Sequence, residues 1–110
     1  MESIKIYYKS CPDIDLQKFI EEGGILLDVR TPAEFFAGHV EGAINIPLER
    51  LTASLHRLPN RHIPLITCCT SGMKSAIAKV ILESQGYTHV CNGGSFNSLN
   101  EKILYGTTSI

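Results

Sequence analysis

The feature that most constrains this chain is an apolar run that ends in a cysteine and is followed at once by a loop of small residues. Residues 63–68 are mostly apolar and indicate a buried strand, residues 69–75 are mostly small or polar, and residues 76–82 are typical of a helix. Cys69 therefore lies where a strand ends and a helix is about to begin. Such a position turns backbone N–H groups and a helix N-terminus toward the sulfur, which lowers a thiol pKa and creates an anion site.

Short apolar runs alternate with helical patterns along the rest of the chain. We expect strands at residues 25–29, 43–46, 63–68 and 89–91. Strands separated by helices favour a parallel sheet with helices on both faces, so the predicted class is α/β. The chain has 110 residues without repeats or low-complexity segments, and we expect residues 1–110 to form one domain.

Capping residues mark where several helices begin and end. Thr31, Pro32 and Glu34 predict a helix N-terminus with a capping box, and that helix should end near Gly38. Gly86 suits the position just past the helix that follows the cysteine loop. Other helices are indicated by apolar sets: Ile14, Leu16, Phe19 and Ile20, with Ser10 or Asp13 as the cap; Leu48, Leu51, Leu55 and Leu58; Ile77, Val80 and Ile81 as one face; and Phe96, Leu99 and Ile103 after a turn at Gly93 and Gly94.

Composition excludes several classes of function. The formal net charge of -1 leaves no basic surplus for nucleic acid or an anionic membrane surface. No apolar span is long enough for a membrane helix, and residues 1–10 lack the apolar core of a signal peptide, so we expect a cytoplasmic location. In a reducing cytosol the four cysteines, Cys11, Cys68, Cys69 and Cys91, should be free thiols. Their spacing, and that of the histidines, does not favour a metal site.

The loop after Cys69 is suited to hold an anion. Small side chains at Thr70, Ser71 and Gly72 let the backbone curl so that successive amides converge on one point, with Gly72 providing the conformational freedom. Most buried cysteines do no chemistry, but this strand-end position favours a reactive Cys69. Adjacent strand residues point to opposite faces, so Cys68 is predicted to lie in the core, with a redox pair of the two cysteines as the alternative.

Three charged residues are further site candidates. Lys74 is the cation of the loop, and it either holds an anionic substrate or is an ordinary solvated lysine. Asp28 and Arg30 end a different strand, and sites of parallel sheets assemble where strands end. These two residues either contact the cysteine loop or form a structural ion pair. His39 and Glu41 are expected at the surface.

Two motifs of the chain resemble those of the rhodanese-like sulfurtransferases in their single-domain form. Residues 27–35, continued by residues 38–47, match the first signature of that family, and residues 69–75 match its active-site loop. Residues 93–96 resemble the glycine pair and aromatic residue near the end of the domain. The similarity covers roughly residues 12–104. It implies a rhodanese-like fold, a central parallel five-stranded sheet flanked by helices on both faces.

The resemblance also implies a persulfide mechanism. The Cys69 thiolate would take sulfane sulfur from a small anionic donor such as thiosulfate and pass it to a thiol, cyanide or protein acceptor by a covalent route. No metal or organic cofactor is implied. Asp28 and Arg30 would support the site, and the donor would be bound by the loop residues Thr70, Ser71, Gly72, Met73, Lys74 and Ser75.

The chain departs from the commonest family pattern at three positions. Lys74 stands where arginine is usual, which keeps the charge but loses the bidentate fork. Thr70 replaces a frequent arginine, so the loop is less cationic. Ser95 stands where a bulkier residue often follows the glycine pair. None of these changes removes the nucleophile.

Three alternatives stay open. Cysteine phosphatases and arsenate reductases use similar loops with five residues between cysteine and arginine, whereas four residues separate Cys69 from Lys74. The tighter loop suits a single sulfur atom better than a tetrahedral oxyanion. A non-enzymatic binding module of the same fold often lacks the cysteine, which this chain keeps. A sulfur-carrier module differs from the leading interpretation mainly in its acceptor.

Overall fold

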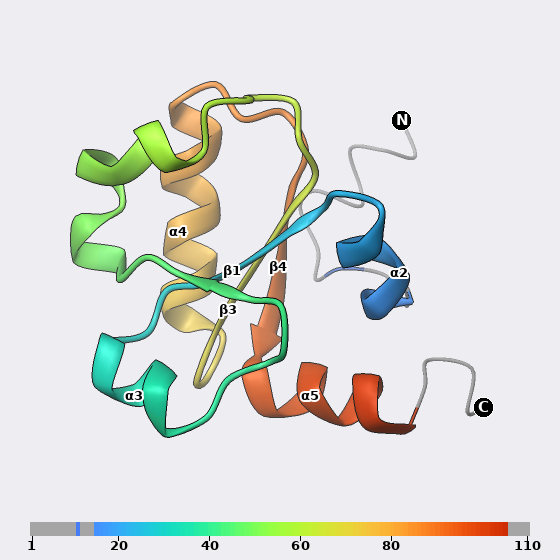
Figure 1. Cartoon of the computed structure of the whole chain (residues 1–110). Coiled ribbons are helices and arrows are strands. Elements are labelled where there is room, and N and C mark those ends of the chain that lie inside the picture. The colour runs from blue at the N-terminus through green and yellow to red at the C-terminus, as the bar shows by residue number, and fades with distance from the viewer. Residues whose placement is uncertain (1–10, 12–14, 106–110) are drawn as a thin grey trace.

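The computed structural model describes residue 11 and residues 15–105, and it is built on a parallel sheet (Figure 1). In this part of the chain the sheet has four strands, in the spatial order β2-β1-β3-β4. All neighbouring pairs are parallel. The α/β class is confirmed, although the resemblance implied five strands. The strands are β1 (Ile25–Asp28), β2 (Ile44–Asn45), β3 (Leu65–Cys69) and β4 (Val90–Ser95).

Helices cover both faces of the sheet. Figure 1 shows α4 on one side and α2 with α5 on the other. Among the described residues, no helix is both long enough and apolar enough to cross a membrane. The helices are α2 (Leu16–Glu21), α3 (Pro32–Ala37), α4 (Met73–Ser84) and α5 (Phe96–Tyr105), and the 3-10 helices are η1 (Leu48–Arg50) and η2 (Thr52–Arg57).

β3 divides the apolar interior into two cores, because its side chains alternate between the faces. Leu65 and Cys69 belong to the core under α4, whereas Ile66 and Cys68 belong to the core under α2 and α5. All five residues of β3 are buried. A strand that is covered on both faces has an almost continuous apolar sequence. This apolar run is why the sequence predicted the strand.

The pairing of β3 with β4 contains an irregularity at the end of β3. Thr67 pairs with Asn92, but Cys69 pairs with Ser95, so two steps along β3 correspond to three along β4. A bulge of this kind bends a strand and increases its twist. It places Ser95, at the end of β4, opposite Cys69, the last residue of β3.

The two glycines of β4 make this bend possible. A Cβ atom on Gly93 would lie 2.6 Å from Cγ2 of Ile66 and 2.9 Å from the carbonyl oxygen of Thr67. Gly94 has φ of 79°, a left-handed conformation that favours glycine. The expected turn at Gly93 and Gly94 therefore lies within β4, and α5 begins directly after it at Phe96.

The predicted start and end of α3 are confirmed. The Thr31 side chain accepts the Glu34 N–H, and the Glu34 carboxylate accepts the Thr31 N–H, so the capping box is present. The helix ends at Ala37 with Gly38 as its C-cap. The cap of α2 is Asp15; the expected caps Ser10 and Asp13 lie outside the described residues.

The helix expected from Leu48 to Leu58 is instead two 3-10 helices, η1 and η2. The leucines occur in pairs three residues apart, Leu48 with Leu51 and Leu55 with Leu58, and three residues make one turn of a 3-10 helix. Leu51 and Leu58, which directly follow η1 and η2, are the buried members of the two pairs.

The prediction for the apolar face of α4 is wrong. Ile77 and Val80 are 50% and 65% exposed, and only Ile81 is partly buried. The residues that α4 buries follow helical spacing: Ser75, Ala78, Lys79 and Leu82.

Candidate active site

The sulfur of Cys69 lies at the N-terminus of α4 and takes the place of a side-chain cap. It accepts the N–H of Gly72 at 2.9 Å and the N–H of Ser75 at 3.3 Å. The N-cap residue, Gly72, makes no side-chain cap of its own. Cys69 is 1% exposed, so these amides act on a sulfur that is screened from water.

The loop can curl around the sulfur because of one glycine. Gly72 has φ of 98°, which is strained for residues with a side chain. A Cβ atom there would lie 3.5 Å from the Cα of Gly94, so the loop passes close to the bend of β4. The N–H of Met73 is directed to the Ser71 hydroxyl at 3.4 Å.

The environment of Cys69 favours its ionised form. Burial alone would raise the pKa of the thiol. Hydrogen bonds from the Ser75 side chain, the Ser75 N–H and the backbone of Gly72 and Ser71 outweigh burial, and the pKa of Cys69 is lowered from its ordinary value. A lowered pKa is the condition for a nucleophilic thiolate at neutral pH.

Ser75 joins the sulfur to the neighbouring strands. It is fully buried, and its carbonyl oxygen accepts a hydrogen bond from the Thr67 hydroxyl at 2.8 Å. Its own hydroxyl lies 3.4 Å from the Cys69 sulfur and 2.6 Å from the Asn92 side-chain oxygen. Sequence reasoning missed Thr67 and Asn92. The available signal for Thr67 was a polar residue inside the apolar run of β3, whereas the sequence of β4 gives no such contrast around Asn92.

The predicted loop residues fall into two groups. Cys69, Gly72 and Ser75 come together around the sulfur, whereas the side chains of Thr70, Ser71, Met73 and Lys74 are exposed. Lys74 lies in the first turn of α4 and is in electrostatic reach of α3. Hydrogen bonds from Thr31 lower the pKa of Glu34, and the charge of Lys74 adds to that shift.

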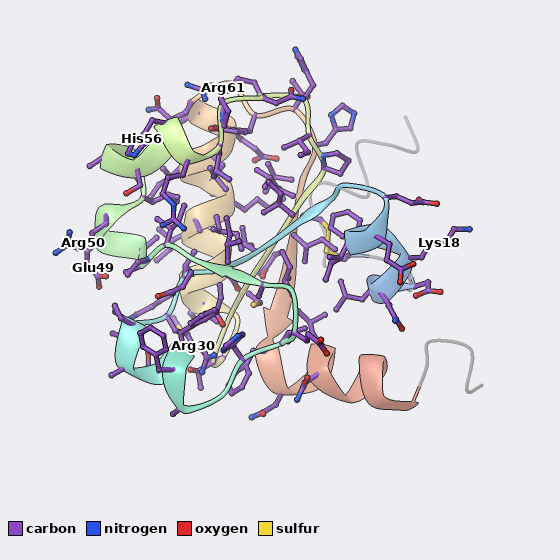
Figure 2. The ribbon with its side chains drawn as sticks, in the orientation of Figure 1. Lys18, Arg30, Glu49, Arg50, His56 and Arg61 are labelled. Atoms are coloured by element: carbon purple, nitrogen blue, oxygen red, sulfur yellow. A yellow bond between two sulfur atoms is a disulfide. The ribbon has the colours of Figure 1, made fainter. Side chains whose placement is uncertain are left out.

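Asp28 and Arg30 form a buried ion pair, the structural one of the two interpretations. The Arg30 Nε and Nη2 atoms lie 3.0 and 2.9 Å from the two carboxylate oxygens. Nη2 also donates to the Gly38 carbonyl at 2.7 Å, and the guanidinium lies 3.6 Å from the centre of the Phe96 ring. Arg30 thus ties the end of β1 to the end of α3 and the start of α5 (Figure 2).

Cys68 is a core residue, as predicted. It is fully buried and packs with Leu26 and Ile66 on the face away from α4. Burial raises the pKa of the Cys68 thiol, and the charge of Asp28 adds to that effect. The pKa values of the two adjacent thiols are therefore shifted in opposite directions.

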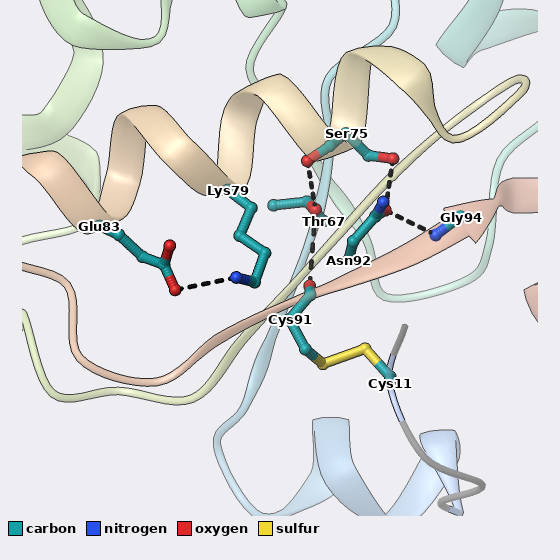
Figure 3. The surroundings of a disulfide bond; sticks show 8 residues. All are labelled: Cys11, Thr67, Ser75, Lys79, Glu83, Cys91, Asn92 and Gly94. Atoms are coloured by element: carbon teal, nitrogen blue, oxygen red, sulfur yellow. Dashed lines mark hydrogen bonds and ion pairs between the residues drawn. A yellow bond between two sulfur atoms is a disulfide. The ribbon is translucent and has the colours of Figure 1, made fainter. Parts of the chain in front are cut away.

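The other two cysteines are not free thiols. Cys11 and Cys91 form a disulfide that spans 80 residues of sequence, and Cys68 and Cys69 remain free (Figure 3). The expectation of a free thiol at Cys11 and at Cys91 is therefore wrong. A backbone hydrogen bond also joins Cys11 to β4, because the Cys11 N–H donates to the Asn92 carbonyl at 3.2 Å.

A buried, hydrogen-bonded cysteine at the end of a parallel strand and the start of a helix defines an α/β protein with a cysteine-loop site. The family described as "Rhodanese-like domain" matches residues 14–101, and the chain belongs to this family. The thiosulfate sulfurtransferase PspE of Escherichia coli is 38% identical over 74 residues, which cover 66% of this chain and 71% of that protein.

Solved structures confirm the rhodanese-like fold. The human single-domain sulfurtransferase TSTD1 aligns with a TM-score of 0.67 and 29% identity, over 79% of this chain and 90% of that one. A structure described as a rhodanese with anions from E. coli aligns with a TM-score of 0.64 and 37% identity, over 68% of this chain and 89% of that one.

Proposed function

We propose that this protein is a sulfurtransferase that carries sulfane sulfur on Cys69 as a persulfide. The main support is the sulfur of Cys69, which accepts the N–H groups of Gly72 and Ser75 at the start of α4. Further support comes from the family, since relatives named thiosulfate sulfurtransferase and single-domain sulfurtransferase share most of the chain.

In the first step, the Cys69 thiolate attacks the outer sulfur of thiosulfate. The new S–S bond forms as the bond from that sulfur to the sulfonate group breaks, and sulfite leaves with the electron pair. The product is a Cys69 persulfide anion. Two anions meet in this step, so the N–H groups and the helix N-terminus offset their repulsion.

In the second step, a thiophilic acceptor attacks the outer sulfur of the persulfide. With cyanide as acceptor the product is thiocyanate, and the Cys69 thiolate is released as the S–S bond breaks. A thiol or a protein acceptor reacts at the same atom. The route is covalent and has two half-reactions, so ping-pong kinetics are expected. It needs neither a metal nor an organic cofactor.

The exposed loop residues serve the donor in this proposal. Lys74 supplies a point charge at the first turn of α4, where it attracts the dianion without clamping it as an arginine fork would. Thr70, Ser71 and Met73 form the outer surface of the same loop. The loop is also one residue shorter than a phosphatase loop, which favours sulfur transfer over phosphate hydrolysis.

The disulfide bears on the compartment. We expected a cytoplasmic location from the sequence, and the bond between Cys11 and Cys91 weighs against it because disulfides persist mainly in oxidising compartments. Thiol labelling of the protein isolated from its own cells tests this. Reduced Cys11 and Cys91 would favour the cytoplasm, and an intact disulfide would favour an oxidising compartment.

The decisive experiment is intact-protein mass spectrometry after treatment with thiosulfate. The wild type should gain one sulfur atom, which cyanide then removes, and Cys69→Ser should gain none. Cys68→Ala is the matched control, since it removes the adjacent buried thiol and should still gain the sulfur. An unchanged mass of the wild type, or phosphatase turnover that depends on Cys69, would contradict the proposal.

A further inference from the structure

Asn92, on β4, makes contacts around the Cys69 loop that the sulfur-transfer steps do not yet use. Its side-chain oxygen lies 2.6 Å from the Ser75 hydroxyl and accepts the Gly94 N–H at 2.9 Å. Its side-chain nitrogen donates to the Gly72 carbonyl at 3.2 Å. Figure 3 shows the amide between Ser75 and Gly94.

The partners fix the orientation of this amide. The Gly94 N–H can only donate, so it must face the Asn92 oxygen, and the Gly72 carbonyl can only accept, so it must face the nitrogen. The register irregularity between β3 and β4 follows directly after Asn92 and brings Gly94 to its side-chain oxygen. One side chain thus contacts both residues whose N–H groups bind the Cys69 sulfur.

We propose that Asn92 is a positioning residue for the chemistry of Cys69: its amide holds the Gly72 carbonyl and the Ser75 hydroxyl so that the N–H groups and the hydroxyl of these two residues face the sulfur. The proposal rests on the proposed sulfur transfer for its function. Asn92 itself is not placed in contact with the donor or the acceptor.

The geometry gives the Ser75 hydroxyl two states. It has one hydrogen, and the nearer of its two acceptors is the Asn92 oxygen at 2.6 Å, against 3.1 Å to the Gly72 carbonyl. While Cys69 is protonated, its S–H donates to the Ser75 oxygen and Ser75 donates to Asn92. When Cys69 ionises, the hydroxyl turns its hydrogen to the thiolate.

The Asn92 side-chain oxygen tolerates this change because two groups donate to it, and it loses only one of them. After the Ser75 hydroxyl has turned to the sulfur, the Asn92 oxygen still accepts the Gly94 N–H, so no buried acceptor is left unpaired. Throughout, the Asn92 nitrogen holds the Gly72 carbonyl, and the Gly72 N–H stays on the sulfur.

The test is the rate of Cys69 alkylation by iodoacetamide against pH, in two variants. Asn92→Asp keeps the oxygen for Ser75 and Gly94, but it cannot donate to Gly72 and adds a negative charge. Asn92→Gln keeps the amide and the net charge and displaces the amide by one methylene. Both variants should raise the pKa of Cys69 by about one unit. At pH values below the pKa, the fraction of Cys69 present as thiolate should therefore be about tenfold smaller. kcat/KM for thiosulfate should fall with it, most strongly at low pH.

Asn97→Asp is the matched control, because it makes the same change of charge at an exposed position on α5. It should leave the Cys69 titration unchanged. Urea unfolding of each variant verifies the fold. If Asn92 acts through its partners, the Asn92→Gln shift should be clearly smaller in a Ser75→Ala background, since contacting residues couple.

Two outcomes would overturn the positioning role. One is a wild-type titration in folded Asn92→Asp and Asn92→Gln; the other is an equal shift in Asn97→Asp. Alkylation requires no sulfur donor, so this test is separate from the proposed function. A protein that takes no sulfur from thiosulfate but shows the Asn92 shift would refute sulfur transfer and support the positioning role.

Discussion

Cys68 and Cys69 are identical side chains in opposite environments, one residue apart. The strand sends Cys68 into the core under α2 and α5 and Cys69 to the start of α4. Burial and the charge of Asp28 raise the pKa of the first thiol, whereas the amides and the Ser75 hydroxyl lower the pKa of the second. The pKa values of the two thiols are therefore set by position and not by residue type.

This contrast predicts a single reactive thiol with a shifted titration. In the folded wild type, iodoacetamide should label Cys69 alone, because the pKa of Cys69 is lowered, the pKa of Cys68 is raised, and the other two cysteines are paired. The labelling rate should rise with pH and reach half its maximum below the free-thiol value of about 8.5. Peptide mapping identifies the labelled residue. A midpoint at or above 8.5 would contradict the lowered pKa.

Lys74 provides the second prediction at this scale. Lys74→Ala should lower kcat/KM for thiosulfate roughly tenfold, since a charged contact to the donor is lost, and should affect cyanide use less. Lys74→Arg should retain most activity. Lys18→Ala removes an equal charge from α2, on the other side of the sheet, where Lys18 is 66% exposed, and serves as the control (Figure 2). Full activity of Lys74→Ala would make Lys74 an ordinary surface residue.

A site residue could be predicted where its partners are close to it in sequence, and could not be predicted where they are far away. The strand-end cysteine, the turn at Gly72 and the burial of Cys68 are local, and the sequence predicted them. Asn92 could not be predicted in this way, because it lies on another strand and reaches Ser75 only through the register of β4 against β3. No local pattern encodes that register.

At the scale of elements, the end of a helix could be predicted from nearby residues, whereas the buried face of a helix could not. The capping box of α3 uses residues within one turn, so Thr31 and Glu34 were sufficient to place its start. The buried face of α4 depends on what the helix packs against. The helix buries Ser75 and Ala78 and leaves Ile77 and Val80 exposed, so hydrophobicity alone did not identify the buried face.

Gly93 of β4 lies close against β3, which leads to a prediction about the packing of these two strands. Gly93→Ala would place its Cβ 2.6 Å from Ile66 Cγ2 and 2.9 Å from the Thr67 carbonyl oxygen. The strands must shift to accommodate it, which should lower the free energy of unfolding by about 1–3 kcal/mol. Urea denaturation measures this loss.

The matched control is Gly38→Ala, at the end of α3. A Cβ there would meet nothing within 4 Å, and φ of 164° is extended backbone that alanine adopts. Its free energy of unfolding should stay within about 0.5 kcal/mol of the wild type. Equal losses in the two variants would mean that the close approach at Gly93 does not limit stability.

At the scale of the whole molecule, the parallel sheet with helices on both faces was predictable, and the covalent link was not. Alternating strands and helices imply the sheet, whichever strands become neighbours. The pairing of Cys11 with Cys91 depends on the chain before α2 meeting β4. Four cysteines allow several pairings, and the assumption of a reducing compartment led to the wrong expectation for these two.

The disulfide closes most of the chain into one loop, which leads to the last prediction. Cross-linking residues this far apart reduces the entropy of the unfolded chain, so replacing both cysteines by serine should lower the free energy of unfolding by about 2–4 kcal/mol. Sulfur transfer should persist in the folded variant, because the contacts to the Cys69 sulfur come from Gly72 and Ser75 and not from the disulfide. Urea denaturation with and without reductant measures the effect. Reductant should destabilise the wild type by the same amount and leave the double variant unchanged, whereas a wild type insensitive to reductant would show that the bond contributes no stability.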